Sequence, residues 1–266
     1  MRKINKGYTI HDIPKSLRLP DAANFEDGRI IIQARNTQIK REELIAATGY
    51  IYNDQYDSRY KLDDIKDTLI GYYHHKCAYC EQRIEQFHVE HYRPKRIYYW
   101  LAFSWDNLIV ACPDCNTSKG SNFPIQSVAI AGLMNNTDIN TQSHLHDDIE
   151  QPFMVNPEVT DPSGYIRFDK DGRIDSDDPR FYYTIRICKI DRLYLNDDRK
   201  KILDKFKEHL KAEQRINQDK NKLLNAIDAL SRAFIREAEN EKSTFLAFRK
   251  YAIDNWLRDE IKAILR

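Results

Sequence analysis

The stretch HVEHYRPK, residues 88–95, lies between two CxxC pairs, CAYC before it and CPDC after it. The four cysteines of these pairs are Cys77, Cys80, Cys112 and Cys115. Two CxxC pairs separated by 31 residues predict a tetrahedral zinc site, because each pair can supply two thiolates from one tight turn. Four thiolates leave no coordination position open, so the predicted Zn²⁺ is structural. It would hold the segment between the pairs in place.

Composition limits the class of protein only broadly. The chain has 266 residues, enough for one large domain or several small ones. Its 42 basic and 41 acidic residues give a net charge of +1, so total charge does not favour a nucleic-acid binder. No apolar run approaches the roughly 18 residues of a membrane span, and the start MRKINKGYTI lacks the apolar core of a secretory signal. We therefore expect a cytoplasmic protein without membrane association.

The pattern of apolar residues predicts an α+β chain that is mainly helical. We divide it into an N-terminal arm and short helix (1–60), the zinc-bearing module (61–125), a polar loop (126–155), and a β-hairpin followed by a helical region (156–266). His144 and His146 fall in the polar loop, where exposed surface histidines are expected. Asp171-Gly172 predicts the hairpin turn. Cys188, alone in an apolar run, is expected to be buried.

The run from Cys77 to Gly120 contains CAYC, VEHYRPK, SWDNL and ACPDCNTSKG in that order. It resembles the HNH nuclease family, in its zinc-bearing four-cysteine branch, whose core is the ββα-metal motif. The resemblance implies that Glu90 is a metal ligand and that His91 is the general base, both on the second strand of the motif. It also implies that Asn107 braces the connecting loop and that Asn116, in the helix, is the second metal ligand.

These residue types suit phosphodiester hydrolysis. A histidine can take a proton from water near neutral pH, and a carboxylate with an amide oxygen can hold Mg²⁺ or Mn²⁺ in a half-open site. Many family members have aspartate where Glu90 stands, which leaves the choice of metal open. Adjacent residues of a regular strand point to opposite faces, so Glu90 and His91 can share a site only through a distortion or at a strand end.

Positive side chains around this motif are candidates for phosphate contacts. We assign this role to Arg93, Lys95 and Lys119, because such contacts hold the backbone of the substrate without reading its sequence. His88 is two residues from Glu90 and on a strand would share its face. It is either an accessory ligand or substrate contact, or a surface residue.

The surrounding sequence narrows the resemblance. KCAYCE, VEHYRPK, ACPDCNTSKG and the downstream NPEVTDP and TIRI are similar to the PtuB-type HNH nucleases of Septu and retron-associated anti-phage systems. This similarity implies an effector nuclease that acts on nucleic acid, with DNA favoured and RNA possible, together with a PtuA-like ATPase.

Two alternatives remain open. One is a zinc-stapled module that binds nucleic acid or protein and carries a vestigial nuclease site. The other is a stand-alone HNH restriction endonuclease, which would need an element that reads sequence. The chain contains neither a recognisable helix-turn-helix nor a basic stripe.

Overall fold

A short antiparallel pair of strands lies at the centre of the fold. β1 (His88–His91) pairs with β2 (Leu108–Ala111), and Glu90 faces Ile109 across the pair. All four residues of β2 are buried, whereas β1 alternates between exposed and buried positions. Such alternation places one face of β1 on the core and leaves the other face open. The computed structural model describes residues 1–20, 28–134 and 138–265.

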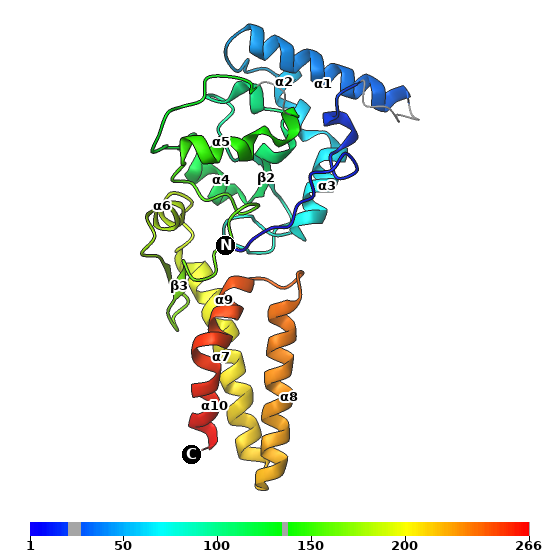
Figure 1. Ribbon diagram of the computed structural model, residues 1–266. Coiled ribbons are helices and arrows are strands. Elements are labelled where there is room, and N and C mark those ends of the chain that lie inside the picture. Colours follow the sequence, from blue (N-terminus) through cyan, green and yellow to red (C-terminus); the bar gives the residue numbers. More distant parts are fainter. Residues whose placement is uncertain (21–27, 135–137, 266) are drawn as a thin grey trace.

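Helices surround this pair in a compact body that forms the upper part of Figure 1. Its helices are α1 (Gly28–Ala46), α2 (Asp54–Asp57), α3 (Asp63–Tyr73), α4 (Pro113–Lys119), α5 (Gln142–Glu150) and α6 (Pro179–Ile187). α3 buries Ile65 and Leu69, four residues apart on one face, against the body, as the apolar spacing predicts. The result is an α+β fold around the cysteine cluster.

A long helical region extends away from the body (Figure 1). It consists of α7 (Leu193–Ile216), α8 (Lys220–Glu239), α9 (Leu246–Ala252), a π-helical turn (Ile253–Leu257) and α10 (Arg258–Leu265). Its apolar stripes meet in a small second core, separate from the core of the body. The buried members of this second core are Phe206, Leu210, Ile227, Phe234, Ala252 and Leu257.

The predicted hairpin is present as β3 (Arg167–Phe168) and β4 (Ile174–Asp175), which pair in antiparallel fashion. Gly172 in its turn has a positive φ of 80°, and an added Cβ would lie 2.2 Å from the carbonyl oxygen of Asn196 in α7. Only glycine fits this contact between turn and helix. The Gly172 carbonyl also accepts a hydrogen bond from Arg199, 3.0 Å away, which ties the hairpin to α7.

The segment predicted as an exposed polar loop differs from expectation. Its residues 142–150 form α5, and residues 135–137 lie outside the described part of the chain. His146 is fully buried, so the prediction of exposed histidines there was wrong. The physical reason is Arg93, whose buried guanidinium pairs with Asp147 and Glu150 of α5. A buried cation needs such partners, and they draw the polar segment onto the body.

Two further sequence predictions can be compared with this fold. Cys188 is fully buried, as expected. Among the described residues, no helix is both long enough and apolar enough to cross a membrane.

Candidate active site and cysteine cluster

The two CxxC pairs converge in the body. The reactive sulfur atoms of Cys77, Cys80, Cys112 and Cys115 lie within 4.8 Å of one another, and all four residues are buried. The Sγ atoms of Cys80 and Cys112 are 3.9 Å apart. A tetrahedral site with Zn–S bonds of about 2.3 Å places its sulfurs about 3.8 Å apart, so the cluster fits Zn²⁺.

Backbone contacts shape both turns of the cluster. The amide of Ala78 donates to the carbonyl of Val110 at 2.8 Å, which attaches the first turn to β2. Cys112 caps α4, because its sulfur accepts a hydrogen bond from the amide of Cys115 at 3.4 Å. The guanidinium of Arg192 lies 3.6 Å from the sulfur of Cys115, so a positive charge from the start of α7 faces the thiolates.

A surface cavity of about 540 Å³ lies beside β1. Its lining residues come from β1 and the residues beside it, from α4, from α3 and from the short turn before α3. They are Tyr60, Lys61, Lys66, Phe87, His88, Val89, Glu90, His91, Lys95 and Asn116. Glu90, His91 and Asn116, three of the residues predicted for catalysis, therefore share one cavity.

The strand geometry allows this convergence. Glu90 lies on the open face of β1. His91 is the last residue of the strand, where the regular alternation of side chains ends. The resemblance implies the second strand for this pair. In the described part of this chain the pair lies instead on the first strand, β1, which precedes β2.

His91 is held in one orientation. Its Nε2 lies 2.9 Å from the carbonyl oxygen of Ala102. A carbonyl only accepts, so Nε2 carries the proton and Nδ1 carries the lone pair. Among the residues that the structure describes, none hydrogen-bonds to Nδ1. Burial, together with the nearby charge of Lys95, lowers the pKa of His91 to about 3. The imidazole is therefore neutral near pH 7, with its lone pair on Nδ1.

Glu90 is partly exposed, and one of its oxygens is already engaged. The Nζ of Lys119 donates to Oε1 of Glu90 at 2.7 Å and to the carbonyl of His91 at 2.9 Å. The Lys119 side chain is fully buried. Through these two hydrogen bonds, Lys119 holds the end of β1 in place and orients the carboxylate of Glu90.

Asn116 and His88 meet at the rim of the cavity. The Nδ2 of Asn116 donates to Nδ1 of His88 over 2.7 Å. Asn107 lies deeper and is fully buried. Its Oδ1 accepts from the amide of Arg93 at 2.7 Å, and its Nδ2 donates to the carbonyl of Leu101 at 3.1 Å. These bonds span the loop between the strands, the position that a bracing residue requires.

The three predicted phosphate contacts lie in different places. Lys95 lines the cavity, where its Nζ pairs with Asp57, bonds to the hydroxyl of Tyr60 at 2.8 Å and lies 4.2 Å from the ring centroid of Tyr50. Arg93 is fully buried and paired with α5, and Lys119 is buried beneath β1. The geometry therefore gives Arg93 and Lys119 structural contacts rather than access to phosphate.

Two lysines that line the cavity were not predicted from the sequence. Lys61 and Lys66 line the same cavity as Glu90, although they precede it by more than twenty residues. No local pattern distinguishes them from ordinary surface lysines, because only the tertiary fold brings α3 and the turn before it to the cavity. The contact between the Ala102 carbonyl and His91 was not predicted either, because every residue has a carbonyl and no sequence pattern marks this one.

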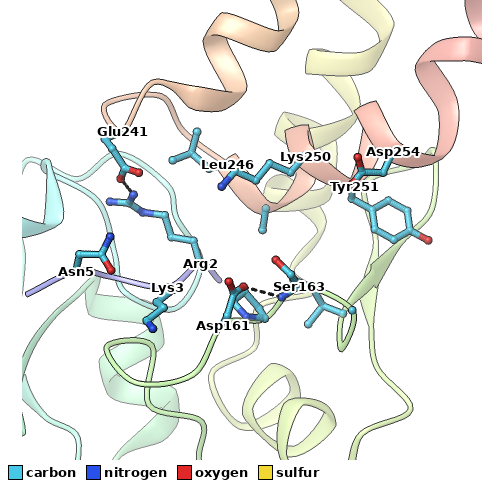
Figure 2. Close-up of a pocket in the computed structure, with 14 residues that line it drawn as sticks. Arg2, Lys3, Asn5, Asp161, Ser163, Glu241, Leu246, Lys250, Tyr251 and Asp254 are labelled. Atoms are coloured by element: carbon cyan, nitrogen blue, oxygen red, sulfur yellow. Dashed lines mark hydrogen bonds and ion pairs between the residues drawn. The ribbon is translucent and has the colours of Figure 1, made fainter.

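A second cavity, of about 250 Å³, lies between the N-terminal segment, the loop at residues 161–164 and α9 (Figure 2). Arg2 pairs across it with Glu241, and Lys250 and Asp161 also line it. Its charges are of both signs, and none of the predicted site residues lines it. We regard it as part of the junction between the body and the helical region.

Comparison with known proteins shows what this site is similar to. Residues 77–122 match the HNH endonuclease family model. This segment contains the cysteine cluster together with Glu90, His91, Asn107 and Asn116, and the match confirms the resemblance found in the sequence.

Two curated relatives are also similar to the chain. Septu protein PtuB from Bacillus mycoides (strain KBAB4) is 29% identical over 162 residues, which cover 54% of this chain and 52% of that protein. Septu protein PtuB from Bacillus thuringiensis is 31% identical over 107 residues, which cover 39% and 32% respectively. The chain thus spans about half the length of the first relative and a third of the second.

Proposed function

We propose that this chain is a metal-dependent HNH endonuclease that hydrolyses phosphodiester bonds of nucleic acid, with DNA as the favoured substrate. One observation carries the proposal. His91 is fixed by Ala102, none of the residues that the structure describes bonds to its Nδ1, and it lines the same cavity as Glu90 and Asn116. A neutral, oriented imidazole beside two oxygen donors is the arrangement that base-catalysed attack of water on a phosphate needs.

In this mechanism His91 takes a proton from the attacking water through Nδ1, while Ala102 keeps the ring in place. Glu90 and Asn116 would hold Mg²⁺ or Mn²⁺, which when bound supplies Lewis acidity and stabilises the leaving oxygen. Lys95, with Lys61 and Lys66 at the rim, offers positive charge to the substrate backbone.

We further propose that the chain acts as the effector nuclease of a Septu-like anti-phage system together with an ATPase partner. Similarity to the two PtuB proteins supports this assignment. The helical region is our candidate for the partner surface, since it projects from the body.

The first experiment is a cleavage assay of the wild-type chain beside His91→Ala, with His11→Ala as a matched control at an exposed position. Plasmid DNA, single-stranded DNA and RNA are offered with Mg²⁺ or Mn²⁺, with and without the ATPase. We expect His91→Ala to lower cleavage by at least about 100-fold, and His11→Ala to leave it unchanged. Equal cleavage by all three proteins would refute the assignment of His91. Nucleic-acid binding without cleavage under every condition would favour the binding-module alternative.

A further inference from the structure

His88 stands outside the mechanism described above, yet it lies at the same cavity. On β1, residues two apart share one face, so His88 and Glu90 both project from the open side, with Cα atoms about 7 Å apart. Val89 and His91 between and after them belong to the buried side. The strand itself therefore brings an imidazole next to the predicted carboxylate ligand.

The contact between His88 and Asn116 indicates where this imidazole points. An amide NH₂ group only donates, so Nδ1 of His88 accepts the 2.7 Å hydrogen bond with its lone pair. That lone pair is the electron pair with which a neutral histidine binds a metal. It is directed at Nδ2 of Asn116, the side chain whose amide oxygen we assign as the second metal ligand, so a bound metal would replace this hydrogen bond.

The charge of the site gives a reason for a third ligand. Lys119 donates to Glu90 over 2.7 Å and offsets its negative charge. Asn116 is neutral. A hard cation such as Mg²⁺ depends on charged oxygen ligands, and this pair alone offers it little net charge. An imidazole instead favours borderline first-row cations, for which nitrogen ligands are well suited.

We propose that His88 is a third protein ligand of the catalytic divalent metal. Together with Glu90 and Asn116 it completes a histidine–carboxylate–amide set, and it shifts the preference of the site from Mg²⁺ toward Mn²⁺. This inference rests on the proposed nuclease function for the identity of the site, but its test does not depend on cleavage.

The test is pulsed electron paramagnetic resonance of Mn²⁺ added to the 266-residue chain whose cysteine cluster has first been loaded with Zn²⁺. A coordinated imidazole produces nitrogen modulation of the electron spin echo. We expect this modulation in the wild type and in His91→Ala, and its loss in His88→Ala and His88→Gln. Both His88 variants change an exposed side chain and leave the core intact. Glu90→Gln and Asn116→Ala locate the ion, because each should weaken Mn²⁺ binding.

Affinities provide the second readout. We expect His88→Ala to lower the ratio of Mn²⁺ to Mg²⁺ affinity by about tenfold or more, measured by titration calorimetry, and His11→Ala to leave the ratio unchanged.

Three results would overturn the proposal. The first is Mn²⁺ binding that depends on Glu90 and Asn116 but shows no nitrogen modulation, in which case His88 only orients Asn116 and the nuclease proposal stands. The second is modulation lost in His91→Ala but kept in His88→Ala, which assigns the nitrogen to His91. The third is Mn²⁺ binding that is indifferent to Glu90, Asn116 and His88, which removes the metal site. Failure of the nuclease proposal itself appears separately, as absence of cleavage in the assay above.

Discussion

The body and the helical region of this chain are held together by different kinds of interaction. The core of the body buries ionisable groups, among them Lys6, Arg93, Asp106 and Lys119, and each of these four has a partner. The second core, between α7, α8 and the C-terminal helices, consists of six buried apolar residues and no ionisable group. The conformation of the body thus depends on single polar contacts and a metal cluster, whereas that of the helical region depends on repeated apolar spacing.

The cysteine cluster is one of the places where the two regions meet. Lys76, next to the first CxxC pair, donates to the carbonyl of Ser243 at 2.7 Å in the loop between α8 and α9. Arg192, just before α7, faces the sulfurs of Cys112 and Cys115. Stability of the body and docking of the helices are therefore coupled at this contact, and substitutions on either side can separate the two contributions.

The largest difference between the regions should follow from loss of the metal. Cys112→Ala removes one thiolate, and structural Zn²⁺ supplies on the order of 10 kcal/mol of apparent binding free energy to small zinc modules. We expect hydrogen exchange to become fast in β1, β2 and α4 while α7 and α8 keep more of their protection. Cys188→Ala is the matched control, because Cys188 is buried but lies outside the cluster. The protein with this substitution should keep its zinc. Uniform loss of protection would mean that the helical region has no stability of its own.

A cavity created in the second core tests whether the helical region can lose stability while the body keeps its zinc. Phe234→Ala removes a buried ring that contacts Phe206, with centroids 5.1 Å apart, and should cost about 3–5 kcal/mol in the helical region. Leu224→Ala, on the exposed side of the same helix, should cost far less. Urea unfolding monitored by far-ultraviolet circular dichroism measures both. We expect zinc content to stay unchanged in Phe234→Ala, and its loss would show that the two cores unfold as one.

Substitution of Arg192 measures the coupling between the docking of α7 and metal binding by the cysteine cluster. Its guanidinium compensates the negative charge of four thiolates, and groups of this kind typically change metal affinity by about 10–100-fold. Arg192→Ala should accelerate transfer of zinc to a coloured chelator by a similar factor. Arg186→Ala, an exposed arginine on α6, is the control. Equal transfer rates in the two variants would mean that α7 docks without influencing the cluster.

The smallest effect concerns pH, which should act mainly on the body. Burial raises the pKa of Asp106 to about 7, although hydrogen bonds from Ser104 and His144 oppose the increase. Because this folded-state pKa lies above the unfolded value, folding retains a proton. The stability that this proton contributes is complete below about pH 4 and is lost as pH rises through 7.

Asp106→Asn should therefore flatten the decrease in the free energy of unfolding between pH 5 and 8. Urea titrations at both pH values measure it, with Asp148→Asn at an exposed position as the control. An unchanged slope would remove Asp106 as the cause of the pH dependence.

Much of the fold was accessible from the sequence where a repeating pattern or a strict spacing exists. The cysteine cluster, the residue range of the HNH motif, α3, the hairpin turn and the long C-terminal helices belong to this group. Predictions based on residue type alone did less well. Arg93 and Lys119 were taken for phosphate contacts because they are cations near the motif, and α5 was taken for an exposed loop because it is polar.

The sequence by itself determined which chemical groups are available: four thiolates in two pairs, Glu90 followed by His91, and two asparagines at set distances. Only the tertiary structure decided which of the nearby cations face solvent, that Ala102 orients His91, and that Lys61 and Lys66 join the cavity. The reason is physical. Ligand spacing and apolar periodicity are local properties of a chain, whereas the burial of a charge and the partner it finds depend on which distant segments pack against it.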